Sequence, residues 1–503
     1  MEKEIIPSGE PLFESLDMTP AAFKEMGYKV VDGMADYFSS IRERRIISES
    51  SSLGIQEVFN EDLPIRGQEP SAIFDQWNQQ VIPHAAHLGS PRYFGFVNGS
   101  GNMISVFASA LATSVNMNSG GWKAGPAATE IERRSIAWIA ELIGFPVNCG
   151  GLFLGGGTIA NFSALLVALK NHNNYNATGD GLQTGSNVKF LVYMSDHEGH
   201  ISIEKAAEMA NLGSNSVRRV ASNEDLTMNV QVLEEMILAD KEAGHIPYCV
   251  VAQVGSINVG VVDPLEEIAR ICQAHQLWFH ADGACGAFGA MLPEKKHLFR
   301  GLEKADSVTL DPHKWLYIPY ECGCLLVKHP EKLRHTFSIA APYLKGTLPT
   351  DYAGQDYFEY GPQMSRGFNA LKVWMSIKYH GKEGYQKLLR QNIQCAVHLD
   401  GLVRSSADFV PMHQPELFIY SFRFVPASLQ NQDAELINHD LDQLNQKITD
   451  EIMASGFAFI MTSKVKGRVV IRLSICSHRT TLQDIEQVFS RLASIGNRLF
   501  AAH

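Results

Sequence analysis

Apolar, strand-like segments alternate with helical segments through the middle of the chain, and this alternation limits the fold more than any other feature. The residues that predict strands are 189–194, 248–254, 277–280 and 306–310. Helical patterns at residues 201–212 and 264–275 separate some of them. This order is typical of an α/β domain with a mostly parallel sheet. Open sheets of this kind bind ligands beyond the carboxyl ends of their strands, so the residues that follow these strands are the first candidates for a site.

Two charged residues lie at such strand ends. Asp282 follows the strand that ends at His280, and Lys314 follows the next one, within Asp311-Pro312-His313-Lys314-Trp315. A lysine near apolar walls is desolvated, which lowers the pKa of its ammonium and makes the neutral amine available for Schiff-base chemistry. The alternative for an isolated lysine is a side chain that snorkels from a strand end to water. The segments described next favour the first interpretation.

A glycine-rich segment runs into the helix predicted at residues 162–171. Gly155, Gly156 and Gly157 are followed by Thr158. Glycines at a helix start allow backbone N–H groups to approach an anion, the helix dipole favours negative charge there, and the Thr158 hydroxyl adds a donor. The segment matches neither GxGxxG nor a Walker loop, so by itself it is a weak indication of phosphate binding.

Two histidines and two carboxylates lie close together at residues 195–200, Ser-Asp-His-Glu-Gly-His. They could indicate a metal site. However, no second ligand cluster of the HExxH or CxxC kind accompanies them, so we expect no metal. A histidine directly before a helix can instead present the flat face of its imidazole to a ring.

These features together match the needs of pyridoxal phosphate (PLP). Its phosphate needs the glycine-rich segment, its pyridine nitrogen needs a carboxylate such as Asp282, and its aldehyde needs a lysine such as Lys314. Its ring can be sandwiched between an imidazole and a small residue such as Ala284. A nucleotide-dependent oxidoreductase would use the glycines but leave Lys314 and Asp282 without a role, and the dinucleotide fingerprint is missing. A non-catalytic scaffold that keeps the fold is the third alternative.

The motifs resemble those of the group II PLP-dependent amino-acid decarboxylases, and the resemblance covers nearly the whole chain. Residues 311–315 are similar to the family's Asn/Asp-Pro-His-Lys-Trp, and residues 280–284 to its His-x-Asp-x-Ala. The resemblance implies fold type I of the PLP-dependent transferases, like aspartate aminotransferase, and a homodimer with active sites at the interface. The residues that it implies for cofactor binding are Gly156, Gly157, Thr158, His200, Asp282, Ala284, Asp311, His313 and Lys314.

The resemblance also implies roles in catalysis. Lys314 would bond to the cofactor aldehyde, and Asp282 would pair with the pyridinium that absorbs the electrons released with CO₂. His200 would stack on the ring; it is favoured over His197 because Glu204-Lys205-Ala206 follows it downstream.

The long segment 341–365 predicts a functional loop. By resemblance, one of its tyrosines protonates the product, and Tyr352 and Tyr357 are both candidates. Arg366, which directly follows the loop, resembles an arginine found near the active site of the family and is a candidate for substrate binding.

The substrate is expected to be an L-amino acid, and the residues after Arg92 indicate its side chain. Phe96 and Val97, followed by Asn98 and Gly99, form a candidate wall whose apolar members favour an aromatic side chain, like that of tryptophan or tyrosine. Small residues at 118–120 enlarge or polarise the pocket, which an indole tolerates. An acidic substrate (glutamate, aspartate or cysteine sulfinate) is the alternative, but it needs extra donors because a buried unpaired charge is costly.

The length of 503 residues, 45% of them hydrophobic, is enough for several domains. We expect a helical, dimer-packing N-terminal segment at residues 1–85, in which residues 48–67 form a loop. A large PLP-binding α/β domain is expected at 86–380, and a small α+β domain at 381–503. In the small domain, residues 457–462 and 468–475 predict a hairpin across Lys466-Gly467.

The overall composition limits partners and location. The net charge of −11 differs from the basic balance of a nucleic-acid binder. No apolar run is long enough for a transmembrane helix, and the N-terminus lacks the apolar core of a signal peptide. Eight scattered cysteines without a CxxC pair indicate a reducing compartment. We therefore expect a cytoplasmic enzyme with a small-molecule substrate and no nucleic-acid or membrane partner.

Overall fold

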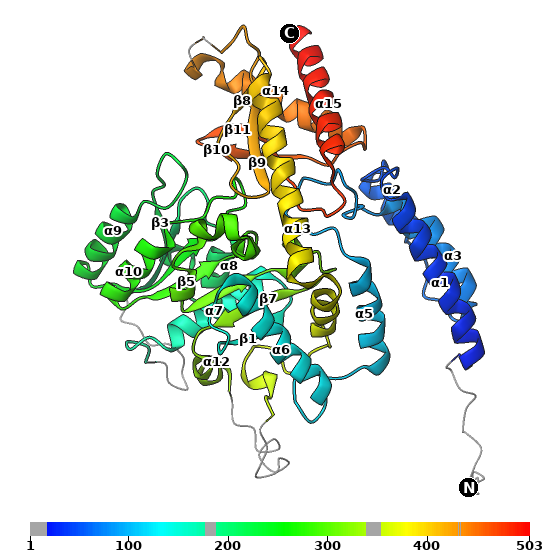
Figure 1. Ribbon diagram of the computed structural model, residues 1–503, viewed down its shortest axis with the longest axis horizontal. Helices are drawn as coiled ribbons and strands as arrows, with labels where there is room; N and C mark the ends of the chain where they lie inside the picture. Colours follow the sequence, from blue (N-terminus) through cyan, green and yellow to red (C-terminus); the bar gives the residue numbers. More distant parts are fainter. Residues whose placement is uncertain (1–17, 177–187, 339–353, 431, 433, 503) are drawn as a thin grey trace, which may run out of the picture. The chain divides into compact units, whose positions relative to one another are not determined.

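The structure, a computed structural model, describes residues 18–176, 188–338, 354–430, 432 and 434–502 (Figure 1). The chain separates into two compact units, Met1–His87 and Leu88–His503. Tyr352, one of the two candidate loop tyrosines, lies outside the described residues. Within the described residues, no helix is both long and apolar enough to cross a membrane.

The first unit is helical. Its helices are α1 Pro20–Ser40, α2 Ser52–Val58, α3 Pro70–Gln76 and α4 Ile82–His84, with a π-helical turn at Trp77–Val81. The hydroxyl of Thr19 caps α1 by accepting from the Ala22 N–H at 3.2 Å, and Pro20 occupies the first turn, where its missing N–H costs nothing. Residues 48–67 were predicted to be a loop, but they contain the helix α2. The hydroxyl of Ser51 caps this helix by accepting from the Gly54 N–H.

The second unit contains a seven-stranded sheet in the order β1-β7-β6-β5-β4-β2-β3. The neighbouring strands β6, β5, β4, β2 and β3 run parallel, whereas β7 is antiparallel to both of its neighbours, β1 and β6. Sheet and fold therefore agree with the predicted mostly parallel α/β domain. The bounds are β1 Gly150–Leu154, β2 Phe190–Ser195, β3 Val217–Val220, β4 Ile246–Gln253, β5 Trp278–Asp282, β6 Ser307–Leu310 and β7 Gly323–Val327.

Helices cover both faces of this sheet, so its central strands are buried on both sides. In β2, Leu191 and Tyr193 pack into one hydrophobic cluster, whereas Phe190 and Val192 pack into another. This alternation follows from the two-residue period of a strand. The helices are α5 Met103–Val115, α6 Pro126–Ile143, α7 Gly157–Lys170, α8 Ser202–Met209, α9 Val230–Glu242, α10 Leu265–His275, α11 Pro312–Trp315 and α12 Pro330–Phe337.

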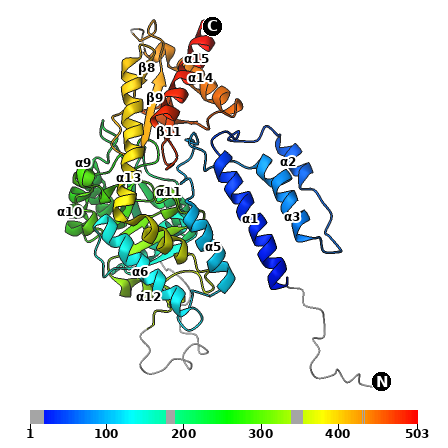
Figure 2. The same cartoon turned by 45° about the vertical axis from the view of Figure 1, so that its right-hand side comes forward.

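A second, antiparallel sheet in the order β10-β11-β9-β8 lies near the C-terminus. Lys466 and Gly467, both with positive φ, form the two-residue turn between β10 and β11, as the sequence predicts for this hairpin. Both views show α14 and α15 beside this sheet, at the level of the upper half of α13 (Figures 1 and 2). The bounds are β8 Phe409–Pro411, β9 Ile419–Phe424, β10 Met461–Val465, β11 Arg468–Ser474, α14 Ala434–Ala454 and α15 Leu482–Ala501.

The two sheets are joined by the long helix α13, Ala370–Ser405. It contacts the helices α5 and α6 of the region around the large sheet, and it also contacts β8, β9 and α15 of the region around the second sheet. The backbone leaves helical geometry at Gly381, where φ is 62°. The kink coincides with the domain boundary expected between residues 380 and 381, and that boundary stays a prediction.

Candidate active site

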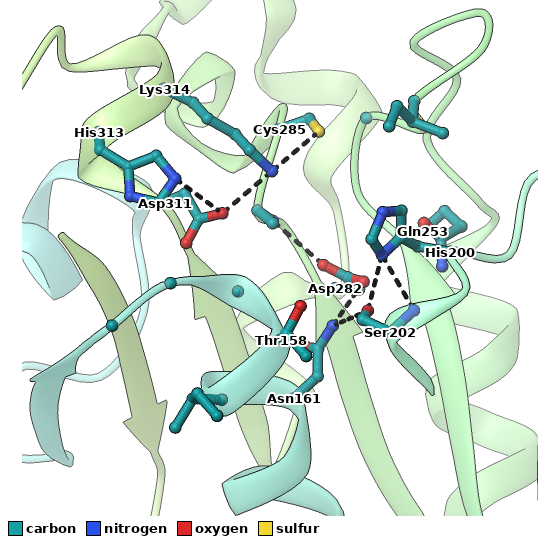
Figure 3. A pocket seen from close by; sticks show the side chains of 17 residues that line it. Thr158, Asn161, His200, Ser202, Gln253, Asp282, Cys285, Asp311, His313 and Lys314 are labelled. Carbon is teal, nitrogen blue, oxygen red and sulfur yellow. Dashed lines mark hydrogen bonds and ion pairs between the residues drawn. The ribbon is translucent and has the colours of Figure 1, made fainter. Parts of the chain in front are cut away.

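A cavity of about 250 Å³ lies at the carboxyl ends of the parallel strands (Figure 3). Its walls come from the segments that follow β1, β2, β4, β5 and β6. The structure brings together in its lining every residue that the sequence assigned to a cofactor, namely Gly156, Gly157, Thr158, His200, Asp282, Ala284, Asp311, His313 and Lys314.

The glycine-rich segment connects the buried strand β1 to the first turn of α7. Gly156 has a φ of 127°, which residues with a side chain rarely adopt. A Cβ on Gly157 would lie 2.9 Å from Asp311 Oδ2 and 3.4 Å from the Ala284 methyl group. Glycine is therefore needed for the close packing at this point, and the start of α7 faces the cavity with its free N–H groups.

Lys314 belongs to α11, a single turn that begins at Pro312 directly after β6. Its Nζ lies 3.0 Å from Asp311 Oδ2 and 3.6 Å from Cys285 Sγ (Figure 3). Burial alone would lower the pKa of Lys314, but the interactions of its amine with Cys285 and with the carboxylates of Asp311 and Asp282 outweigh burial, and the net pKa is raised. The expectation of a lowered lysine pKa was therefore wrong, because the sequence pattern did not reveal the carboxylates that surround the amine.

Asp282 is the last residue of β5, and only 5% of it is exposed. Its Oδ2 accepts a hydrogen bond from Asn161 Nδ2 at 2.9 Å, and its Oδ1 accepts from the Ala284 N–H at 3.3 Å. These donors hold the carboxylate at the cavity wall. Ala284 follows on the same segment, so the small residue and the carboxylate have a fixed separation.

His200 lies directly before α8, and its Nδ1 contacts Ser202 Oγ at 2.7 Å. Burial is the main cause of its lowered pKa, so the imidazole is neutral at neutral pH. His197, the alternative, is more than half exposed and lies 3.5 Å from Asp196. It is absent from the described lining of the cavity, whereas His200 belongs to it.

The predicted substrate wall lies beside the Lys314 turn but outside the described cavity lining. The Gly99 N–H donates to His313 O at 3.0 Å. Asn98 accepts a hydrogen bond from the Tyr320 hydroxyl, and the Tyr320 ring contacts the His313 imidazole. Val97 is buried in the core, and Phe96 is half exposed. The segment therefore packs against the turn that carries Lys314.

Arg366 and Tyr357 lie together, away from the cavity. The guanidinium of Arg366 forms a buried ion pair with Glu132, donates to Phe153 O at 2.8 Å and covers the Tyr357 ring at 4.8 Å. Tyr357 is 1% exposed. Residues 118–120 are held at the same place, because the Ser119 N–H donates to Arg366 O and the Arg366 guanidinium donates to Ser119 O. These contacts support a structural role for Arg366 and Tyr357.

Sequence reasoning missed several residues of the cavity. They are Ile159, Asn161, Ser202, Gln253, Gly255, Ile257 and Cys285, whereas Gly155 belongs to the glycine-rich segment that the sequence had already indicated. The rule that ligands bind at strand ends applies to Gln253, the last residue of β4, and could have found it. Helical spacing could have found Asn161, which lies one turn after Thr158. Within the described residues, no group of three or more His, Cys, Asp or Glu side chains is placed to hold a metal ion.

The residues of the cavity fit PLP. Two buried polar atoms in the lining, Asp311 Oδ1 and Gln253 Nε2, have no hydrogen-bond partner among the described residues. Such atoms are costly unless a ligand or water satisfies them. An anion-binding helix start, a buried carboxylate, a flat imidazole and a lysine amine face the same space. These are the groups that the phosphate, the pyridine nitrogen, the ring and the aldehyde of PLP require.

Comparison with known proteins agrees with this fit. The family model described as "Pyridoxal-dependent decarboxylase conserved domain" matches residues 54–425. An aromatic-L-amino-acid decarboxylase from Bacillus atrophaeus is 31% identical over 97% of this chain and 98% of its own length. Tryptophan decarboxylase 2 from Oryza sativa subsp. japonica is 27% identical over 94% of each chain.

The fold is also found among solved structures. A crystal structure of Oryza sativa TDC with PLP and tryptamine superimposes with a TM-score of 0.89 at 23% identity, over 97% of this chain and 99% of that one. Mouse CSAD superimposes with a TM-score of 0.86 at 23% identity, over 95% and 99% of the two chains. The predicted fold type I of PLP-dependent enzymes is thus confirmed, and the chain belongs to the pyridoxal-dependent decarboxylase family.

Proposed function

We propose that the protein removes the α-carboxylate of an aromatic L-amino acid as CO₂ and leaves the amine. Bound PLP supplies an electron sink for the pair that the departing carboxylate leaves on Cα. The observation that carries the proposal is the cavity in which Lys314, Asp282 and His200 meet the start of α7. The names of two relatives that match this chain over nearly their whole length support the aromatic substrate class.

Each side chain has a part in holding the cofactor. The Lys314 amine would bond the aldehyde, the N–H groups at the start of α7 would bind the phosphate, and Asp282 would keep a proton on the pyridine nitrogen through an opposite-charge contact. His200 and Ala284 would contact the ring. Because Asp282 is held by two donors and His200 by Ser202, these groups are preorganised before a substrate enters.

The charges around the cavity favour a neutral side chain in the substrate. Within the described lining, Lys314 is the only lysine or arginine, and it already pairs with Asp311. His200 and His313 are neutral, because burial lowers the pKa of both. A distal carboxylate, as in glutamate, would therefore lack a charged partner there, which costs more than the burial of an aromatic ring.

The test is a panel of the twenty amino acids, scored for CO₂ release by the PLP-loaded protein. Tryptophan, tyrosine or phenylalanine should give the highest kcat/KM. Preference for glutamate, aspartate or cysteine sulfinate would overturn the aromatic assignment, and no CO₂ release from any of them would overturn the decarboxylase assignment.

We further propose a homodimer. One side of α5 exposes about half of each apolar side chain at four-residue intervals, namely Met103, Phe107, Leu111 and Val115. In the first unit, α1 exposes Phe23 and Tyr28. Such stripes favour burial against another chain. Sedimentation velocity should give twice the chain mass, and Leu111→Glu should shift the protein toward monomer; a wild-type monomer would refute the dimer.

A cytoplasmic location is also proposed. All eight cysteines are free and seven of them are buried, which suits a compartment that keeps thiols reduced. Fractionation of the native cells should recover the protein with cytoplasmic markers, and recovery from an oxidising compartment would refute this location.

A further inference from the structure

A buried amide, Asn161, connects the two side chains that would contact opposite parts of the cofactor. Asn161 lies on α7, one turn after Thr158, and is 1% exposed. Its Nδ2 lies 2.9 Å from Asp282 Oδ2 and 2.9 Å from Ser202 Oγ (Figure 3). Its Oδ1 lies 3.0 Å from Nε2 of the buried His280. One side chain of α7 therefore contacts β5 at two residues and the start of α8.

The directions of these hydrogen bonds follow from the chemistry of the groups. The Asp282 carboxylate can only accept, so the amide nitrogen of Asn161 must face it, and the amide oxygen must then accept from His280 Nε2–H. Burial is the main cause that lowers the pKa of His280 to about 4, so this histidine is neutral. Its Nδ1 consequently accepts from Ser307 Oγ at 2.8 Å, and that hydroxyl accepts from the Trp278 indole N–H.

The same logic extends from Asn161 to His200. The second Nδ2 hydrogen of Asn161 goes to Ser202 Oγ, which leaves the hydrogen of the Ser202 hydroxyl for His200 Nδ1 at 2.7 Å. The Ser202 backbone N–H donates to the same Nδ1 at 3.2 Å. An Nδ1 that accepts from two donors carries no proton. The neutral His200 ring therefore holds its proton on Nε2, the nitrogen not bonded to Ser202.

We propose that Asn161 is a positioning residue that fixes the Asp282 carboxylate and, through Ser202, keeps His200 in its Nε2–H form. This inference deepens the proposed function, because Asp282 and His200 are its main groups beside Lys314. In the Nε2–H form, His200 presents a hydrogen-bond donor rather than an acceptor on its free side. If Asn161 could not donate, the Ser202 hydroxyl would be free to turn away and His200 could take either tautomer.

The test uses cofactor-free protein with ¹⁵N-labelled histidine, so a failure of the decarboxylase assignment does not affect it. The His200 signals are identified by their loss in His200→Gln. In the wild-type protein, Nδ1 should show the shift of a bare nitrogen and Nε2 that of a protonated one at neutral pH. A proton on His200 Nδ1 would overturn the proposal.

Three variants test the path to His200. Asn161→Asp keeps the acceptor for His280 but turns Ser202 around, because the new carboxylate attracts its hydroxyl hydrogen; Ser202→Ala removes that hydroxyl. Both should give His200 a mixture of tautomers. The control Ser216→Ala removes a buried hydroxyl whose one hydrogen-bond partner among the described residues is Gly213 O, and it should leave His200 unchanged. Unchanged His200 signals in both Asn161→Asp and Ser202→Ala would overturn the proposal.

Cofactor binding separates the two branches of the network. Asn161→Asp should raise the PLP dissociation constant by about tenfold or more. The reason is that Asp282 loses a hydrogen bond to its charged carboxylate and gains a second carboxylate as a neighbour. Ser202→Ala leaves the Asn161–Asp282 bond in place and should keep that constant within about twofold while kcat falls. Equal PLP affinity in wild type and Asn161→Asp would refute the Asp282 branch.

Discussion

Loss of Arg366 should damage the stability of the large unit rather than the binding of a substrate. Its side chain is 5% exposed, and that of its partner Glu132 is 1% exposed. Glu132 Oε1 also accepts from the Phe153 N–H at 2.9 Å, so the pair ties α6 to β1. Arg366→Met leaves the Glu132 charge buried without its partner. Breaking a buried pair in this way costs roughly 3–5 kcal/mol.

The matched variants separate a structural role from a role in binding. Removal of both charges, in Glu132→Gln with Arg366→Met, should restore part of the loss because no uncompensated charge remains. Arg390→Met, which breaks an exposed pair with Glu294, should change stability little.

Urea unfolding of cofactor-free protein, followed by tryptophan fluorescence and circular dichroism, measures the midpoint. Arg366→Met should lower it clearly, whereas the PLP dissociation constant stays close to that of the wild type. If the midpoint is unchanged and KM for the amino acid rises by orders of magnitude, the structural assignment is refuted and Arg366 binds substrate.

Three further predictions concern the site. In Gly99→Ala, the new Cβ would lie 2.5 Å from His313 O and closer still to Lys314 O, so the turn that carries Lys314 must shift. The visible absorbance of bound PLP should therefore be lost. The control Gly367→Ala, whose new Cβ would have nothing within 4 Å, should retain it. Asp282→Ala should still bind PLP but lose kcat by orders of magnitude, each tenfold loss equal to about 1.4 kcal/mol of barrier; near-normal turnover would refute its role. The pKa of His280 is about 4 in the fold against an ordinary 6.5, so the unfolded chain binds more protons between these values. Stability should therefore fall as pH drops from 6.5 toward 4, by about 1.4 kcal/mol per pH unit, and a flat urea midpoint over this range would contradict it.

The cofactor half of the site could be predicted from sequence because its residues directly follow strands or lie at the start of a helix. Local sequence patterns indicate both of these positions. Lys314, Asp282 and the glycine-rich segment are of this kind. The same patterns gave the alternation of the large sheet and the hairpin at Lys466 and Gly467.

What could not be predicted depends on contacts between distant segments. The sequence placed Lys314 near apolar walls, but the fold brings the charges of Asp311 and Asp282 to it and raises its pKa. Arg366 was assigned to substrate binding by resemblance, and its ion pair with Glu132 could not be predicted because the two residues lie 234 positions apart. Asn161 and Ser202 carry no local sign that they share a hydrogen bond, since they belong to different helices.

The most direct test of the central claim is to find which lysine carries the cofactor. The PLP-loaded protein is reduced with borohydride, which makes the bond between the cofactor and the lysine permanent, and is then digested and analysed by mass spectrometry. The pyridoxyl mass should appear on the peptide that contains Lys314, and Lys314→Ala should carry none. A label on Lys372 or another lysine, or no label on wild type that has bound PLP, would contradict the assignment of this cavity.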